Sequence, residues 1–278
     1  MNAFEKLIVS LQFEMERPTC YGTFHLCWLL ASAALVVFLS VRKERDHERT
    51  LKTILLLYAI PALMLELTKQ IIWSYSYDTA AGFGHWDYQW YAAPFQLCTT
   101  PIITCLISAF LNKGKMRDSL LSFTAFVTIL GSVATALYPE SCFVRTVLVD
   151  IHTMYLHFGS LVISLYLLIS GEIKPTFRNL LRAWMTFLVF AAIALLLDLA
   201  VYHSGLLGSG QEKETFNMFY ISPYFISVLP VFDGIWTWAD EHHLYLVFLL
   251  IYLFAICAGA GIVWLFARLF SKKQKPVR

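Results

Sequence analysis

Charged residues are scarce in this 278-residue chain: Lys, Arg, Asp and Glu make up 14% of it, whereas 58% is hydrophobic. Soluble domains carry about 25% charged and about 45–50% apolar residues. The mean hydropathy of +0.63 agrees, so water is not the main solvent of this protein. The period-two alternation that is typical of a membrane β-barrel is also missing. The composition therefore predicts an all-α integral membrane protein.

Several motifs of familiar enzyme classes are absent as well. The six cysteines do not form the close pairs that are typical of zinc or iron–sulfur sites, so we expect no metal and no other cofactor. The chain has no glycine-rich phosphate loop and no Gly-x-Ser-x-Gly segment, so nucleotide and serine-hydrolase chemistry have no support.

Seven apolar blocks of roughly 18–25 residues are long enough to cross a ~30 Å hydrocarbon core as helices. They cover residues 23–41, 53–73, 93–111, 119–138, 150–170, 183–203 and 244–268. No repeat or long linker divides the first six, so we expect one helical-bundle domain over residues 1–278. Residues 1–22 place Phe4, Leu7, Ile8 and Leu11 on one helical face, which predicts a short amphipathic helix in the outer interface or packed on the bundle.

The basic residues are concentrated in alternate connections. Sixteen of the 21 lysines and arginines follow the first, third, fifth and last spans. Basic residues accumulate on the cytoplasmic side of membrane proteins. The distribution therefore predicts an external N-terminus and a cytoplasmic C-terminus.

The outer side then includes the longest connection, residues 204–243. Its second half is apolar but interrupted by Pro223 and Pro230, which predicts a re-entrant or surface-lying segment over the outer mouth of the bundle. Cys20 and Cys142 share this side, where they either form a disulfide or remain two free thiols.

Polar side chains of four spans fall into one layer. Ionisable residues within a membrane cost roughly 2.5–3.5 kcal/mol each on insertion scales and usually face a bundle interior or a cavity. At about 1.5 Å per residue, this layer lies roughly 8–10 Å below the outer surface. Its members are Glu66, Lys69, Cys98, His157 and Asp198, with His152 nearer the rim.

These side chains permit a structural and a catalytic interpretation. Glu66 and Lys69 are three residues apart and can simply neutralise each other. A cysteine beside a histidine, however, is the minimum pair for thiolate catalysis, because the imidazole takes the thiol proton and later returns it to a leaving group.

Four segments carry a family resemblance. They are LELTKQIIW with Glu66 and Lys69, WYAAPFQLCTTPIITCLIS around Cys98, HTMYLHFGSLVISLYLL around His157, and FNMFYISP around Asn217. With these segments the chain resembles YwaF-like integral membrane proteins, the bacterial relatives of the animal transmembrane protein 164 acyltransferases. The resemblance implies Cys98 as an acylated nucleophile, His157 as its base and Asn217 as a positioning donor. The animal pattern has a histidine directly after the nucleophile, where this chain has Thr99.

Two functions follow. The first is a phospholipid acyltransferase or transacylase in a bacterial plasma membrane, which forms an acyl-thioester on Cys98 and acts on phospholipids and lysophospholipids, without a nucleic-acid partner. The second is a transporter or ligand-binding membrane protein that uses Glu66, Lys69, His157 and Asp198 as a proton or solute site.

Overall fold

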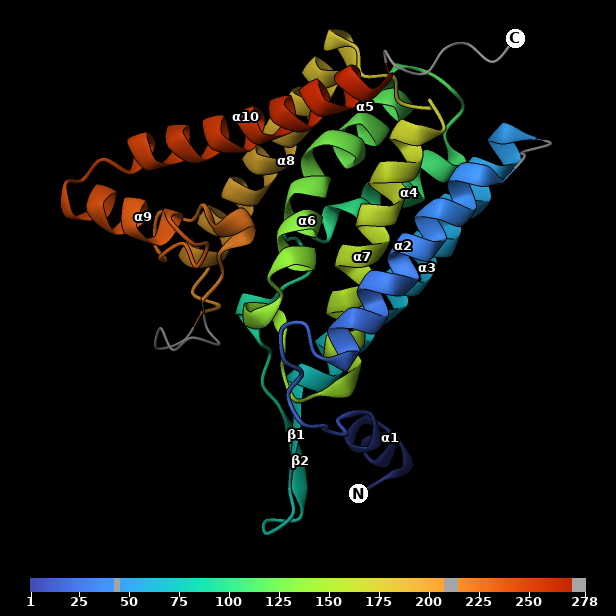
Figure 1. Cartoon of the computed structure of the whole chain (residues 1–278). Coiled ribbons are helices and arrows are strands. Elements are labelled where there is room, and N and C mark those ends of the chain that lie inside the picture. The colour runs from blue at the N-terminus through green and yellow to red at the C-terminus, as the bar shows by residue number, and fades with distance from the viewer. Residues whose placement is uncertain (43–45, 208–214, 272–278) are drawn as a thin grey trace.

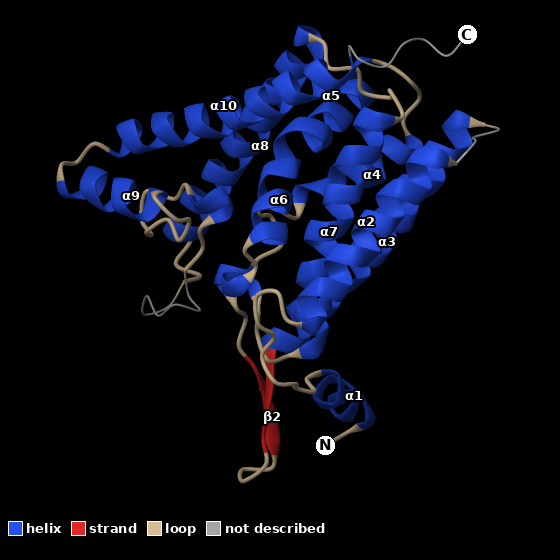
Figure 2. Cartoon of the chain, viewed as in Figure 1, coloured by secondary structure: helices blue, strands red, loops and turns tan. Residues whose placement is uncertain are grey.

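The computed structural model describes residues 1–42, 46–207 and 215–271. Figure 1 and Figure 2 show a tilted bundle of long helices, with α1 and a small hairpin at one end and the C-terminal end of α10 at the other. The helices are α1 (Ala3–Leu11), α2 (Thr23–Val41), α3 (His47–Ser74), α4 (Thr100–Phe110), α5 (Lys115–Phe123), α6 (Ile129–Leu137), α7 (Val147–Ile169), α8 (Phe177–His203), α9 (Phe232–Glu241) and α10 (Tyr245–Ser271). The strands are β1 (Tyr75–Asp78) and β2 (Phe83–Trp86), and the short helical turns are η1 (Trp90–Ala92), η2 (Thr124–Thr128), η3 (Glu140–Cys142) and η5 (Met218–Tyr220).

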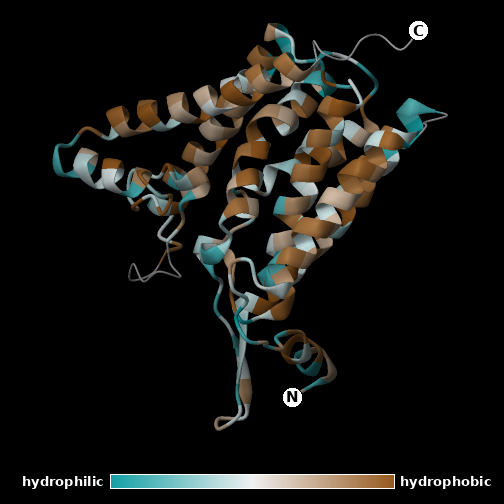
Figure 3. Ribbon diagram, viewed as in Figure 1, coloured by the Kyte–Doolittle hydropathy of each residue, from teal (hydrophilic) through white to brown (hydrophobic). Residues whose placement is uncertain are grey.

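Six of the described helical stretches are long and apolar enough to cross a membrane: α2, α3, Lys115–Leu137, α7, α8 and α10. Each coincides with a predicted span, and α2 has the predicted bounds. Large apolar side chains are exposed along them, for example Leu30, Leu196 and Phe254, and the long helices are largely hydrophobic in Figure 3. Such a surface suits contact with lipid. The predicted all-α membrane fold is confirmed.

The third predicted span, residues 93–111, is only partly helical. The helix α4 has 11 residues, and residues 93–99 before it form an irregular turn. At about 1.5 Å per residue such a helix reaches roughly half-way across the hydrocarbon core. The described residues thus form six long helices and one short helix where the sequence predicts seven spans. The sidedness of the two termini stays a prediction, and residues 272–278 lie outside the described part of the chain.

The predicted N-terminal helix packs on the end of the bundle. Ile8 is buried against Ile72 and its neighbours, and Gln12 Nε2 donates to the Ile72 carbonyl at 2.6 Å. The sequence left two placements for this helix, and the structure shows it packed on the bundle through Ile8. Part of its apolar face, including Phe4 and Leu7, is exposed.

Two further features lie at this end. The sequence analysis did not predict the hairpin of β1 and β2, which pair antiparallel. Its turn is closed by the Asp78 carboxylate, which accepts hydrogen bonds from the amides of Ala80 and Ala81. Cys20 and Cys142 are both free, so the two-thiol alternative holds.

The long predicted outer stretch contains an irregular segment followed by α9. Residues 208–214 of this stretch lie outside the described part. In the remainder, Phe216, Met218, Phe219 and Ile221 are buried in the main core. The irregular backbone is therefore covered by protein, which is the condition under which it is tolerated at membrane depth.

The helices α5 and α6 are two parts of one span joined by the π-helical turn η2. All five residues of η2 are buried. Thr124 Oγ1 lies 2.7 Å from Thr104 Oγ1 of α4, and the Thr124 carbonyl accepts from Ser164 Oγ of α7 at 2.7 Å. The Thr124 carbonyl of the π-turn is thus used by a neighbouring helix.

Candidate active site within the membrane

A buried ion pair lies in the last third of α3. Glu66 Oε1 lies 2.8 Å from Lys69 Nζ, and the two residues are 3% and 8% exposed. Lys69 Nζ also donates to the Ala92 carbonyl at 3.0 Å, while Gln70 Nε2 donates to both Glu66 Oε1 and Ala92 O. Buried charges persist when they are paired and hydrogen-bonded. Glu66 and Lys69 therefore neutralise each other, as the structural interpretation expects.

His152 of α7 joins this pair. Its Nε2 lies 2.8 Å from Glu66 Oε2 at ion-pair distance, and in the described part of the chain neither ring nitrogen makes a hydrogen bond. A carboxylate beside one imidazole nitrogen fixes the orientation of the ring. Depth counting placed His152 at the rim, but the structure brings it to the buried carboxylate.

Cys98 lies in the irregular turn, two residues before α4 begins, and its side chain is half-buried. It is within electrostatic range of Glu66 and Lys69. The irregular turn thus positions the thiol, and the ion pair on α3 acts on it electrostatically.

Thr99 and Gln96 hold this turn in shape. Thr99 Oγ1 accepts from the Gln96 amide at 3.0 Å and lies 2.9 Å from the Pro94 carbonyl, to which it donates. The position where the animal pattern has a histidine is thus occupied here by a buried hydroxyl that closes the turn. Its role in this chain is structural.

Gln96 also joins the turn to the irregular segment before α9. Its Nε2 donates to the Asn217 carbonyl at 3.0 Å, and its Oε1 accepts from the Phe219 amide at 2.9 Å. Phe219 and Tyr220 have φ values of 56° and 58°, a left-handed conformation that is unusual for side chains of this size. The Gln96 side chain thus ties the turn that carries Cys98 to this strained backbone.

Asp198 and Asn217 make hydrogen bonds to the backbone of the irregular segment before α9. Asp198 Oδ1 accepts from the Met218 amide at 2.7 Å, and Asn217 Oδ1 accepts from the Ser222 amide at 2.8 Å. Asn217 Nδ2 donates to the carbonyls of Phe225 and Ile226. These contacts hold the backbone of the irregular segment, so neither side chain belongs to the Glu66 group itself.

His157 lies one turn and a half further along α7 than His152. Its Nδ1 is 3.1 Å from Thr135 Oγ1 of α6, and the ring is within electrostatic range of His152. Among the described residues, His157 and Cys98 make no hydrogen bond with each other.

Thr135 also contacts Cys142, and partial burial raises the pKa of the Cys142 thiol.

The structure thus brings Glu66, Lys69 and His152 into contact, with Cys98 nearby. His157 lies beyond this group, and Asn217 is linked to the Cys98 turn through Gln96. Sequence reasoning missed Gln96 and Thr135. A glutamine two residues before the cysteine, in an otherwise apolar block, was the available signal for Gln96. The described residues contain no group of three or more His, Cys, Asp or Glu side chains arranged to hold a metal ion.

Comparison with known families decides the relationship of the chain. A sequence profile of the TMEM164 family matches residues 20–260. The chain belongs to the TMEM164 family. The matched region contains every residue of the site described above. Neither the curated proteins nor the solved structures that were searched gave a match.

Membership of the TMEM164 family and the six long apolar helices agree with each other. Together they make this chain an integral membrane protein.

Proposed function

We propose that this protein is a membrane-embedded phospholipid acyltransferase that carries the acyl group as a thioester on Cys98. The observation that carries the proposal is the position of this thiol. It stands in a constrained turn before a helix N-terminus, within electrostatic range of the buried Glu66–Lys69 pair. Two histidines of α7 lie in the same region. Nucleophile, base and carboxylate are the parts that thiolate acyl transfer requires.

In the first step the Cys98 sulfur attacks the carbonyl carbon of a phospholipid ester. His157 takes the thiol proton, a carbon–sulfur bond forms and the carbon–oxygen ester bond breaks. The imidazolium then gives its proton to the departing lysophospholipid oxygen. In the second step the hydroxyl of a lysophospholipid, or water, attacks the thioester and gives its proton to His157. The thiolate leaves and takes that proton back, so the protein is unchanged after one cycle.

The depth predicted for the site supports the choice of lipid partners. A thiol below the membrane surface lies close to the depth of ester groups under the headgroups, which favours a phospholipid as acyl donor and a lysophospholipid as acceptor. The resemblance of the four sequence segments to the YwaF-like branch supports a bacterial plasma membrane as the location.

The test is to trap the thioester. Purified protein in detergent is incubated with a phospholipid that carries an alkyne-tagged acyl chain, and labelled protein is located by mass spectrometry before and after hydroxylamine treatment. We expect the label on Cys98, loss of the label in Cys98→Ser and retention in Cys27→Ser, because Cys27 is an exposed cysteine on α2. Labelling that survives in Cys98→Ser would exclude the mechanism.

The base is tested by a matched pair of histidine variants. His157→Gln should slow thioester formation by roughly 10²–10⁴, the usual contribution of general-base catalysis, while folding is preserved. His152→Gln removes the contact with Glu66 but leaves His157 in place. A large loss in His152→Gln with full activity in His157→Gln would transfer the role of base to His152.

A second function is favoured by one observation, the buried group of Glu66, Lys69 and His152. Ionisable side chains inside a membrane often mark a proton or solute pathway. A transporter would keep its activity in Cys98→Ser and lose it in Glu66→Gln, so proton or solute flux in vesicles separates the two candidates.

A further inference from the structure

A second polar site lies at the opposite end of the bundle from α1 and the hairpin. A cleft of about 650 Å³ opens there between the first turns of α3, the end of α4, the α4–α5 connection and Arg117 of α5. Its wall includes the apolar residues Leu51, Leu55 and Phe110. Basic side chains from α3, the α4–α5 connection and α5 also line the cleft. The cleft therefore combines a hydrophobic wall with four cationic side chains and the carboxylate of Glu48.

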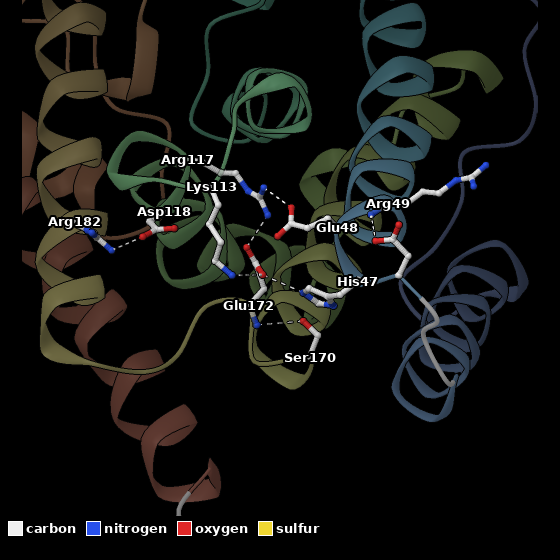
Figure 4. Close-up of polar contacts among 10 residues, drawn as sticks. His47, Glu48, Arg49, Lys113, Arg117, Asp118, Ser170, Glu172 and Arg182 are labelled. Atoms are coloured by element: carbon white, nitrogen blue, oxygen red, sulfur yellow. Dashed lines mark hydrogen bonds and ion pairs between the residues drawn. The ribbon is translucent and has the colours of Figure 1, made fainter.

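Arg117 is the fixed cation of this cleft. Its side chain is 5% exposed, with Nη1 at 2.6 Å from Glu48 Oε2 and Nη2 at 2.8 Å from Glu172 Oε1. Figure 4 shows Glu172 among Arg117, Lys113 and His47, which come from three different parts of the chain. The other Glu172 oxygen lies 3.0 Å from His47 Nε2. These contacts hold the Arg117 guanidinium rigidly against the cleft.

Two polar atoms of the lining have no partner in the described part of the chain. They are Arg117 Nε and Ser108 Oγ, and both are buried. Ser108 is 2% exposed, and both residues line the cleft. A buried donor without a partner is uncommon in folded proteins and often indicates a group that is supplied from outside. A guanidinium N–H and a hydroxyl are both donors to an anionic oxygen.

The mouth of the cleft has two cations that are not neutralised by close contacts. Lys52 Nζ lies over the Phe110 ring, 5.1 Å from its centroid, and among the described residues it has no carboxylate within ion-pair distance. Lys113 is 68% exposed, and its Nζ is 3.9 Å from Glu172, at the limit of an ion pair. Arg49 also lines the cleft, but its side chain extends away from this group in Figure 4. An anion can therefore reach Lys52 and Lys113 without breaking a buried pair.

We propose that this cleft binds the phosphate group of an anionic ligand, with Lys52 and Lys113 as its mobile contacts and Arg117 and Ser108 at its base. Basic pockets between membrane helices recognise anionic lipid headgroups in this way. The adjoining apolar wall fits the glycerol and upper acyl chain of a phospholipid. A soluble phosphate compound shares the same chemistry, and the experiment separates the two sources. The site is independent of Cys98.

The experiment uses the full chain in nanodiscs. Binding is measured by native mass spectrometry with phosphatidic acid, and with phosphatidylcholine as the zwitterionic comparison. The Lys52→Gln/Lys113→Gln double variant should bind phosphatidic acid at least about tenfold more weakly, because each lysine near an anionic lipid contributes about 1 kcal/mol. The matched control, Lys6→Gln/Lys115→Gln, removes two charges outside the lining and should bind like the unaltered protein.

Glycerol 3-phosphate added at millimolar concentration identifies the source. If it fails to displace phosphatidic acid, the ligand is a lipid, and if it displaces the lipid and binds with the same lysine dependence, the ligand is a soluble phosphate compound. Equal binding of phosphatidic acid by the two double variants would overturn the proposal. So would equal retention of phosphatidylcholine and phosphatidic acid. The Cys98→Ser protein should bind as the unaltered protein does, which keeps this result separate from the acyltransfer test.

Discussion

The two carboxylates that hold Arg117 should contribute very differently to stability. Arg117 is bound by Glu172, whose side chain is 2% exposed, and by Glu48, whose side chain is 53% exposed. Removing one partner of a buried ion pair costs about 3–5 kcal/mol, because an uncompensated charge stays behind. In Glu172→Gln the guanidinium keeps Glu48, so we expect the loss to fall below that range, at about 2–3 kcal/mol.

The matched variant is Glu48→Gln. Solvent screens a half-exposed pair, and such pairs contribute about 0–1 kcal/mol. The buried Glu172 would remain with Arg117, so this variant should lose less than about 1 kcal/mol. The two changes are chemically identical and act on the same guanidinium, so their difference reports the burial of Glu172 together with its additional contact with His47.

The measurement is equilibrium unfolding in mixed detergent micelles, followed by circular dichroism, with both variants and the double variant. A loss in Glu48→Gln equal to or larger than that in Glu172→Gln would refute the assignment of Glu172 as the dominant partner. The double variant should lose more than the sum of the two single variants, because only then is Arg117 left without either carboxylate.

Three further predictions concern packing, the hairpin and topology. Gly159→Ala should destabilise the protein by about 1–3 kcal/mol in the same unfolding assay, because its Cβ would stand 2.7 Å from the buried Tyr58 ring. Gly131→Ala meets nothing within 4 Å and should be neutral or stabilising, so equal losses would contradict the packing argument. The amides of Ala81 and Ala80 hold the pKa of Asp78 below its ordinary value of 3.8, so the turn should lose these bonds only as the pH falls through that lower value. The Ala80 and Ala81 amide resonances should titrate together below pH 3.8, and a midpoint above it would disprove the contact. A reporter fused after Arg278 should be cytoplasmic and one inserted after Leu207 external; finding both on one side would show that the number of crossings is wrong by an odd number.

Span lengths were predictable from the sequence because they depend on hydropathy alone. The bounds of α2 and the presence of α3, α7, α8 and α10 follow from the length of apolar chain that crosses a bilayer. The turn before α4 was not predictable in this way. It lies within a largely apolar block, and the bonds of Thr99 and Gln96 that hold it as a turn depend on the tertiary structure.

The candidate site shows the same limit. Counting residues along a helix gives depth, and depth placed Glu66, Cys98 and His157 in one layer. The direction of each side chain around its helix axis depends on tertiary packing. For that reason the sequence could not show that His152 contacts Glu66 while His157 turns toward Thr135. The basic residues around Arg117 were interpreted only as a sign of orientation, because the glutamate that unites them, Glu172, lies far away in the chain.

The π-helical turn η2 has a consequence for how the chain tolerates changes in length. A π-turn contains one residue more than the α-helix it interrupts. Deleting one residue between Thr124 and Thr128 would remove this extra residue and let Lys115–Leu137 continue as a regular α-helix, so the residues after the deletion would keep their faces. Thr135 would then stay beside His157. Deleting one residue from α5 or α6 would instead rotate everything after it by about 100° about the helix axis, so η2 is the place in this span where the loss of one residue is best tolerated.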